Sequence, residues 1–149
     1  MRRAPYSRGF TLLEILIVLV VMVMILTVVP PMLGSGMTGA ELKSAARSLA
    51  AGLNQARSLA ISQQREATMT VNVDNRTFQV SGVPREYHLP AKAEVKLDTA
   101  RSELASEGVG SIRFFPDGSS TGGRVTVSHG EQRYRVDVEW LTGKVRILD

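Results

Sequence analysis

A long apolar run near the N-terminus constrains this 149-residue chain more than any other feature. Between residues 10 and 33 its only polar side chains are Thr11, Glu14 and Thr27. As a helix, such a run would extend about 36 Å, and a bilayer core needs roughly 20 apolar residues. The sequence therefore predicts a helix over residues 10–33 that can span a membrane.

The basic residues in front of this run predict its orientation. Arg2, Arg3 and Arg8 all precede residue 10, which by the positive-inside rule places the N-terminus in the cytoplasm. They also supply most of the formal net charge of +4, since the rest of the chain is nearly neutral. The overall basicity is therefore poor support for nucleic-acid binding. The position of the arginines predicts a single-pass protein in which the residues after the helix lie outside the cytoplasm.

A cleaved secretory signal peptide is the competing interpretation of a basic start followed by an apolar run. The small residues at 34–36 or 37–40 could provide its cleavage site. Glu14 argues against this, because an acidic residue in a membrane helix costs about 2.5–3.5 kcal/mol at the centre and less near the end. An acid retained in such a segment is expected to have a function and a partner.

The chain has no cysteine, so disulfides and thiolate metal sites are excluded. The two histidines, His88 and His129, are far apart in the sequence, which favours surface or hydrogen-bonded roles over metal ligation. We expect neither a metal nor a cofactor.

The stretch Gly9-Phe10-Thr11-Leu12-Leu13-Glu14 resembles the processing signal of type IV pilins and the related pseudopilins. The resemblance implies that a prepilin peptidase cuts between Gly9 and Phe10, removes residues 1–9 as a basic leader, and leaves Phe10 to be N-methylated. It also gives Glu14 a partner, the freed amine of Phe10 on a neighbouring subunit, in a fibre packed through these helices. Thr11, Leu12 and Leu13 would belong to the same assembly site. A paired buried charge sets register more than it stabilises.

Residues 30–40 contain helix-breaking residues. Pro30 removes a helix donor and clashes with the preceding turn, so we expect a kink there. The glycines at 34, 36 and 39 predict a hinge or short linker over residues 34–40. The remaining residues, 41–149, are predicted to form a periplasmic head.

The head is predicted to begin with an amphipathic helix over about residues 41–65. Thr38 and Glu41 form a capping-box pattern, in which each side chain bonds the other residue's backbone. The small apolar side chains that follow would allow close packing against a sheet. They recur at spacings of three and four, which defines one helical face: Leu42, Ala46, Leu49, Leu53, Ala56 and Ala60.

Beyond residue 67 the apolar period changes to two, which indicates strands. Met69, Val71 and Val73 alternate with polar residues, and the turn at 74–76 leads into a second strand at 77–80. Further strands are predicted at 94–97, 111–115, 124–128, 133–140 and 144–147, with loops at 83–88 and 99–110. In the strand at 133–140, Tyr134, Val136, Val138 and Trp140 are expected to face inward.

A helix followed by antiparallel strands predicts an α+β head with the helix on one sheet face. The resemblance implies the pilin fold, with a long N-terminal helix whose second half packs on the sheet.

A second resemblance lies in Phe115-Pro116-Asp117-Gly118 followed by Gly122-Gly123, which looks like the H-type minor pseudopilin of the type II (general) secretion pathway. Physically this is a turn, because Pro116 presets φ and Asp117-Gly118 completes the reversal. Gly118-Ser119-Ser120-Thr121-Gly122 also fits the nucleophile-elbow pattern G-x-S-x-G. That elbow requires a helix after the serine and a histidine after the acid, and neither is expected here. A sequon at residues 75–77 is explained by the hairpin turn.

The main interpretation is a non-enzymatic minor pseudopilin in the bacterial inner membrane, with a cytoplasmic N-terminus and a periplasmic head. Its expected partners are other pseudopilins, the prepilin peptidase and the inner-membrane secretion platform. The alternative is a minor type IV pilin of a pilus or DNA-uptake system, whose phosphate-binding candidates are Arg133, Arg135, Lys144 and Arg146. A secreted domain released by signal peptidase is the third possibility, and nucleic-acid binding is not favoured.

Overall fold

The computed structural model describes residues 10–33, 37–106 and 108–149, with the backbone alone for residues 26–33. The chain separates into two compact units, Met1–Gly36 and Met37–Asp149, which are described in turn. The predicted leader at residues 1–9 and residues 34–36 of the predicted hinge lie outside the described residues.

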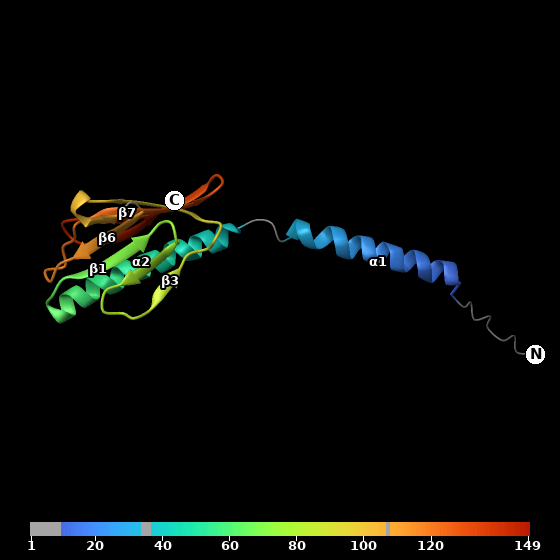
Figure 1. The fold of residues 1–149 in the computed structure, drawn as a ribbon, viewed down its shortest axis with the longest axis horizontal. Coiled ribbons are helices and arrows are strands. Elements are labelled where there is room, and N and C mark those ends of the chain that lie inside the picture. The colour runs from blue at the N-terminus through green and yellow to red at the C-terminus, as the bar shows by residue number, and fades with distance from the viewer. Residues whose placement is uncertain (1–9, 34–36, 107) are drawn as a thin grey trace, which may run out of the picture. The chain divides into compact units, whose positions relative to one another are not determined.

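The first unit contains one helix, α1 (Leu12–Leu33), drawn in blue in Figure 1. Thr11 precedes it as a cap, since its carbonyl accepts from the backbone N–H of Glu14 at 3.1 Å and of Ile15 at 3.2 Å. The helix continues through Pro30 and Pro31. The expected kink at Pro30 therefore does not end the helix.

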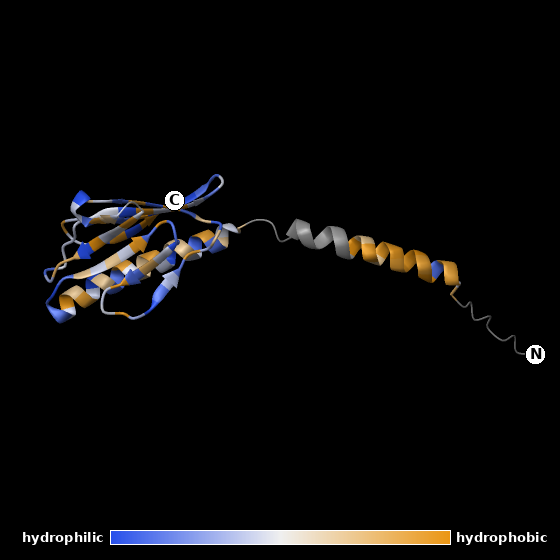
Figure 2. Ribbon diagram, viewed as in Figure 1, coloured by the Kyte–Doolittle hydropathy of each residue, from blue (hydrophilic) through white to orange (hydrophobic). Residues whose placement is uncertain are grey.

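Outside its grey part, α1 is coloured as hydrophobic over almost its whole length in Figure 2. From Phe10 to Ile25 every large hydrophobic side chain is between 48% and 84% exposed. No helix within the fully described parts of the chain reaches the length and hydropathy that a membrane crossing requires. The span predicted over residues 10–33 includes residues described by backbone alone, and it stays a prediction.

The second unit begins with α2 (Gly39–Gln63), and its predicted capping box is confirmed. The backbone N–H of Glu41 donates to Thr38 Oγ1 at 3.3 Å, and that of Thr38 donates to Glu41 Oε2 at 3.0 Å. Because Thr38 caps the helix, Gly39 and Ala40 belong to α2 rather than to the predicted hinge at 34–40. The helix stops at Gln63, and Gln64 adopts a left-handed φ of 51°.

One face of α2 is buried in the core of the head. At Gly52 the helix approaches the sheet so closely that a Cβ atom would lie 2.7 Å from the Phe78 ring. All six residues of the predicted apolar face are at most 1% exposed: Leu42, Ala46, Leu49, Leu53, Ala56 and Ala60.

The strands of the second unit form two antiparallel sheets (Figure 1). One has the order β3-β2-β1-β6-β5 and the other β4-β7-β8-β9, and α2 packs against strands of both. This α+β arrangement confirms the predicted fold class. The bounds are β1 (Ala67–Asn72), β2 (Thr77–Val80), β3 (Glu86–His88), β4 (Glu94–Thr99), β5 (Leu104–Ser106), β6 (Val109–Phe114), β7 (Gly123–His129), β8 (Gln132–Val138) and β9 (Val145–Leu148), with a 3-10 turn η1 (Arg101–Glu103) before β5.

The sequence prediction was wrong about Trp140. Strand β8 ends at Val138, and Trp140 is 66% exposed instead of facing the core. The cause is an early turn, in which the N–H of Gly143 donates to the carbonyl of Glu139 at 2.8 Å. Val136 and Val138 are buried as predicted, and Tyr134 is half-buried.

Two segments predicted as loops contain short edge strands, and one predicted strand is shorter than expected. β3 pairs with β2, and β5 pairs with β6 through an irregular register. Each has only three residues, so its extended form depends on the neighbouring strand. Strand β1 ends at Asn72, because Val73 already takes part in the hairpin turn by accepting from the N–H of Arg76.

Candidate functional site

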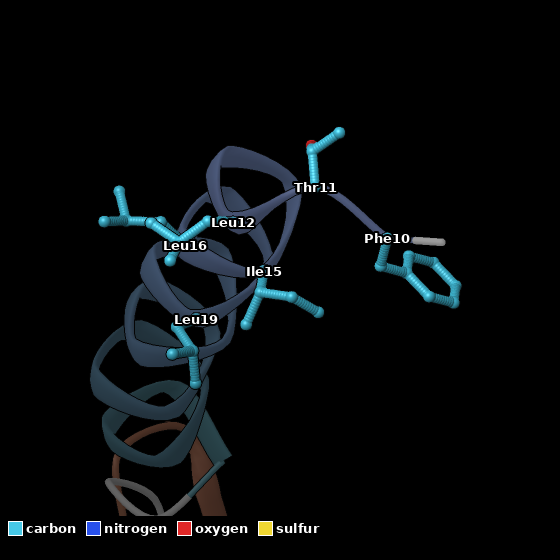
Figure 3. A pocket seen from close by; sticks show the side chains of 6 residues that line it. All are labelled: Phe10, Thr11, Leu12, Ile15, Leu16 and Leu19. Atoms are coloured by element: carbon cyan, nitrogen blue, oxygen red, sulfur yellow. The ribbon is translucent and has the colours of Figure 1, made fainter. Parts of the chain in front are cut away.

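The residues around the predicted processing site lie at the start of α1. Phe10 precedes the helix and is 79% exposed. Figure 3 shows its ring pointing away from the helix. An open, mainly apolar pocket at the start of α1 is lined by Phe10, Thr11, Leu12, Ile15, Leu16 and Leu19. This apolar surface at the start of α1 is largely exposed, and only a partner outside the first unit can cover it.

Glu14 lies in the first turn of α1, where a carboxylate favourably faces the positive end of the helix dipole. Its backbone N–H donates to Thr11 Oγ1 at 3.2 Å. Leu12 and Leu13, in the same turn, are 84% and 69% exposed. The predicted assembly residues are thus brought together, and the structure adds a role for Thr11 as the helix cap, which the Thr-x-x-Glu pattern could have indicated.

The predicted head motif forms the connection from β6 to β7, where the chain passes from one sheet to the other. The N–H of Gly118 donates to the carbonyl of Phe115 at 2.9 Å, which closes the turn around Pro116. Asp117 accepts from the backbone N–H of Ser119 at 2.9 Å and from its hydroxyl at 2.6 Å. These bonds hold the pKa of the Asp117 carboxyl below its usual value, with the hydroxyl as the larger cause. The turn interpretation of the motif is confirmed.

This loop is fastened to the helix and to a second turn. Arg57 Nε of α2 donates to the carbonyl of Gly118 at 3.2 Å, and the N–H of Ser120 donates to the carbonyl of Trp140 at 2.8 Å. Gly143 lies against the Gly118 carbonyl in a left-handed conformation, with φ of 60°, so that a Cβ atom there would collide with the oxygen. The motif therefore holds α2, the inter-sheet connection and the β8–β9 turn together.

The paired glycines of the motif permit two close approaches. A Cβ atom on Gly122 would lie 3.1 Å from Trp140 Cβ, and one on Gly123 would lie 3.0 Å from the carbonyl oxygen of Asp98. Gly122 also has a φ of 73°, which other residues rarely adopt. These glycines let the chain enter β7 between the end of β8 and the end of β4.

A second fastening of the head, not predicted from the sequence, is an ion-pair network at Arg113 of β6. Its guanidinium donates to Glu66 Oε2 at 2.6 Å and to Glu103 Oε1 at 3.2 Å. The Glu103 side chain is only 7% exposed. Hydrogen bonds to Glu103, and then to Glu66, raise the pKa of Arg113. The network joins β6 to η1 and to the residue before β1, which no local pattern in the sequence could reveal.

Charges alternate across the outer face of the four-stranded sheet. In register, Asp98, Arg124, Asp137 and Arg146 form one row over β4, β7, β8 and β9. Arg124 binds both oxygens of Asp137, at 2.6 and 2.7 Å. These hydrogen bonds are the main reason that the pKa of the Asp137 carboxyl is lowered and that of Arg124 is raised.

Two of the basic residues considered for nucleic-acid binding have partners within the protein. Arg146 lies 3.7 Å from Glu139, and Arg135 donates to the terminal Asp149 oxygen at 3.1 Å. Such internal partners leave less free charge for phosphate contacts.

The remaining motifs from the sequence analysis lie in loops, turns and strands of the head. The hydroxyl of Ser120 donates to the carbonyl of Arg113 at 2.7 Å, and strand β7 follows it, so the loop does not have the strand-to-helix geometry of a nucleophile elbow. His88 lies in β3, and the His129 ring lies 3.0 Å from the carbonyl oxygen of Lys92. Asn75 occupies the β1–β2 turn, where its N–H donates to Asn72 Oδ1.

Known proteins match both parts of the chain. A family model described as type II transport protein GspH matches residues 45–142, and a prokaryotic N-terminal methylation motif matches residues 5–30. Type II secretion system protein H of Xanthomonas campestris pv. campestris is 35% identical over 139 residues, which cover 93% of this chain and 82% of the relative.

Solved structures show the same fold at low sequence identity. The minor pseudopilin EpsH from the Type 2 Secretion System of Vibrio cholerae superposes with a TM-score of 0.58 at 16% identity, over 72% of this chain and 96% of that one. The type IV minor pilin FimU of Pseudomonas aeruginosa gives a TM-score of 0.57 at 19% identity, over 74% and 90%. These likenesses establish the pilin-type fold, and together with the family match they show that the chain belongs to the GspH family of type II transport proteins.

Proposed function

We propose that this protein is a minor pseudopilin, a structural subunit of the periplasmic pseudopilus that drives type II protein secretion across the outer membrane. The observation that carries this proposal is the 35% identity with a type II secretion system protein H over 93% of the chain. The matched residues include both the N-terminal segment and the head, so the likeness is not limited to a shared methylation motif. As a fibre subunit the protein would act by packing and would catalyse no reaction of its own.

The N-terminal segment fits processing by a prepilin peptidase, with cleavage between Gly9 and Phe10 and N-methylation of Phe10. The methylation-motif match over residues 5–30 supports this assignment. Phe10 lies outside α1, which starts two residues later. A peptide bond before an exposed residue that precedes the helix can be reached by a protease without unwinding the helix.

Before assembly, residues 10–33 would anchor the protein in the inner membrane, with the N-terminus in the cytoplasm and the head in the periplasm. The support is the sequence of α1, apolar except for Glu14 and Thr27, and the three arginines in front of it. In this state the protein would contact the secretion platform of the inner membrane and the prepilin peptidase.

In the fibre, the exposed apolar surface of α1 would pack against the helices of other pseudopilins. Cleavage creates a cationic amine at Phe10, and Glu14 lies in the first helical turn beside it. An isolated carboxylate buried among apolar helices is unfavourable, and the amine of a neighbouring subunit would provide its counter-charge. Because such a pair forms at one axial offset only, Glu14 would set the register between subunits.

The test combines the mature N-terminus with secretion. We expect mass spectrometry of the membrane-inserted protein to show a chain that begins at N-methylated Phe10. The Glu14→Ala variant should still be cleaved but should lose most of its capacity to restore secretion to a strain that lacks the subunit. Glu41→Ala is the matched control, since Glu41 also lies in the first turn of a helix with a threonine cap but within the head. A mature chain that begins elsewhere, or full secretion with Glu14→Ala, would contradict the proposal.

A minor type IV pilin is the second candidate, favoured by the superposition with FimU. The same fold serves both systems, so structure alone separates them weakly. Expression in strains that lack the corresponding subunit of either system provides the discrimination. Restored secretion without restored piliation is the result expected here, and the reverse would assign the chain to a pilus.

A further inference from the structure

A small socket opens beside the outer side of α2, where the helix meets strands β2 and β3. Its volume is about 160 Å³, close to the size of a protein cavity that holds one benzene molecule. A space of this size admits one apolar side chain rather than a helix or a strand. The socket, here named the Tyr87 socket, is lined by Ser48, Ala51, Gly52 and Gln55 of α2, Phe78 of β2 and Tyr87 of β3.

The walls of the socket are fixed by packing. The rings of Phe78 and Tyr87 are stacked, with centroids 4.9 Å apart and an angle of 7° between their planes. Phe78 is buried in the core, whereas Tyr87 is half-buried. Gly52 brings the helix close to the Phe78 ring, because a Cβ atom there would lie 2.7 Å from Phe78 Cε2. A pocket with walls already in place loses little conformational entropy when it is filled.

The helix surface beside the socket is basic. Between Glu41 and Glu66 the sequence contains four basic residues and no acidic one. Lys43 and Arg47 precede Ala51 at successive spacings of four, so these residues form one row along the exposed side of α2 that leads to the socket. Within the described residues, no carboxylate forms an ion pair with Lys43 or Arg47.

A third cation, Arg85, lies beside the socket just before β3. Its guanidinium carbon is 4.9 Å from the centroid of the Tyr87 ring. Stacking on a ring orients a guanidinium and leaves its in-plane N–H groups able to donate to a carboxylate. Glu86 neighbours Tyr87 on β3, so its side chain points to the other face of the sheet. Glu41, the one acid of α2, already accepts from the N–H of Thr38. The surroundings of the socket therefore favour a carboxylate.

These features select among possible occupants. Lysine and arginine on an exposed helix are ordinary and can face solvent or anionic lipid, but neither partner explains an enclosed apolar space beside them. A helix like α1 offers apolar side chains, yet its single acid is Glu14, which the proposed function pairs with an amine. An occupant with an apolar side chain next to an available carboxylate is therefore expected from the folded head of another protein.

From these features we propose that the Tyr87 socket receives one apolar side chain from the head of a neighbouring pseudopilin, and that an adjacent aspartate or glutamate of that head pairs with Arg47 and Arg85. The identity of the partner as a pseudopilin rests on the proposed function, because subunits of one fibre hold their heads at high effective concentration. The socket and the cations around it are properties of this chain alone.

The first test places a photo-crosslinking amino acid at position 51 of the full-length chain, in cells with an active secretion system. The probes are the other pseudopilins of that system, each carrying an epitope tag. We expect an adduct with one of them, mapped by mass spectrometry to an apolar residue of its head next to an aspartate or glutamate. The same amino acid at Ser58, which is exposed on α2 but lies outside the socket, is the control position and should give at least fivefold less adduct.

Charge reversal then tests the cations. Arg47→Glu should reduce the adduct at least fivefold, and changing the mapped acid of the partner to lysine should restore it. Arg133→Glu makes the same change of charge on β8, in the other sheet, and should leave the adduct intact. Unchanged thermal unfolding of each variant shows that the head is still folded.

A reciprocal experiment tests the apolar part of the socket. The photo-crosslinking amino acid is moved to the mapped apolar residue of the partner, and this chain carries Ala51→Trp, whose large side chain occupies the socket. We expect at least tenfold less adduct than with the unchanged chain, whereas Ser58→Trp should reduce it less than twofold. An adduct that tolerates Ala51→Trp would show that the partner does not enter the socket.

Other outcomes would also overturn the proposal. They are the absence of any pseudopilin adduct, an adduct with lipid or a second copy of this chain alone, an adduct with the N-terminal helix of a partner, and indifference to Arg47→Glu. A chain that is processed at Phe10 and restores secretion but fails these tests disproves the socket alone. Failure of processing and secretion disproves the proposed function.

Discussion

The two helices of this protein illustrate opposite ways in which a helix can be stabilised. In α2, one face is polar and exposed, while the other contributes nine buried residues to the core of the head. In α1, apolar side chains surround the axis, and every one described from Phe10 to Ile25 is exposed. A surface helix of a folded domain turns a polar face to water, and the part of α1 whose side chains are described has no such face.

The comparison indicates which packing contacts stabilise each helix. Isolated helices are marginal in water, and most helical stability in proteins comes from packing of an apolar face. The packing partners of α2 are strands of its own chain, so its stability is a property of the head. Under the proposed function, the partners of α1 would be lipid or the helices of other subunits. Substitutions in α2 should therefore change folding of the head, and those in α1 should change insertion and assembly.

The largest effect should come from truncating a buried leucine of α2. Leu53 is fully buried, so Leu53→Ala should lower the free energy of unfolding of the head by about 2–5 kcal/mol through lost burial and a residual cavity. Urea unfolding of the detergent-solubilised protein, followed by circular dichroism of the β-strands, measures this. Leu16→Ala removes the same atoms from α1, where the side chain is 56% exposed, and should leave that transition unchanged. Equal losses in the two variants would show that the helices are not energetically separate.

A smaller loss is expected when a methyl group is added to α2. Alanine is favoured over glycine within helices by about 1 kcal/mol, but a Cβ atom at Gly52 would lie 2.7 Å from Phe78 and 3.0 Å from the Met69 sulfur. Overpacking costs about 1–3 kcal/mol, so Gly52→Ala should be destabilising on balance. Ser48→Ala on the exposed face provides the control, and urea midpoints provide the measurement. A stabilised Gly52→Ala variant would mean that the helix and sheet can separate slightly without cost.

The caps of the two helices permit a matched pair of substitutions. Thr38→Ala removes the hydroxyl that accepts from Glu41 in α2 and should cost the head about 1 kcal/mol. Thr11→Ala removes the equivalent bond to Glu14 in α1 and should not change the unfolding of the head. It should instead increase fraying at the start of α1, measurable as faster hydrogen exchange of the backbone amides of Glu14 and Ile15. If Thr11→Ala destabilised the head, the two units would have to be coupled.

The features that the sequence predicted well are those encoded by local patterns. The capping box at Thr38 and the buried face of α2 were predicted to the residue, because three- and four-residue spacing follows from helix geometry. The turn chemistry of Pro116, Asp117 and Gly118 was equally local. The assembly role of Glu14, inferred from one carboxylate in an apolar run, stays a prediction.

The features that were missed depend on residues distant in the sequence. Trp140 continues the alternation of β8, and only the turn closed by Gly143 takes it out of the strand. The partition of the strands into two sheets, and the network around Arg113, likewise depend on pairings between segments 10 to 47 residues apart. Such contacts are fixed by the packing of the whole head rather than by local sequence.

The smallest predicted effect is electrostatic and confined to the head. The pKa of Asp137 is lowered from its usual 3.8, mainly by the hydrogen bonds from Arg124, so the unfolded chain binds more protons than the folded one at acidic pH. The stabilisation is fully present above that usual value and is lost as pH falls through the lower folded pKa. Asp137→Asn should therefore reduce stability slightly at neutral pH, with a difference from the wild type that shrinks as the solution becomes more acidic than the usual pKa. Urea unfolding across pH 2–7 tests this, with Glu131→Gln in the exposed turn as control. If the difference stayed constant or grew toward low pH, protonation of Asp137 would not remove the stabilisation that Asp137→Asn removes. Arg124 and Asp137 would then not stabilise the sheet as an ion pair.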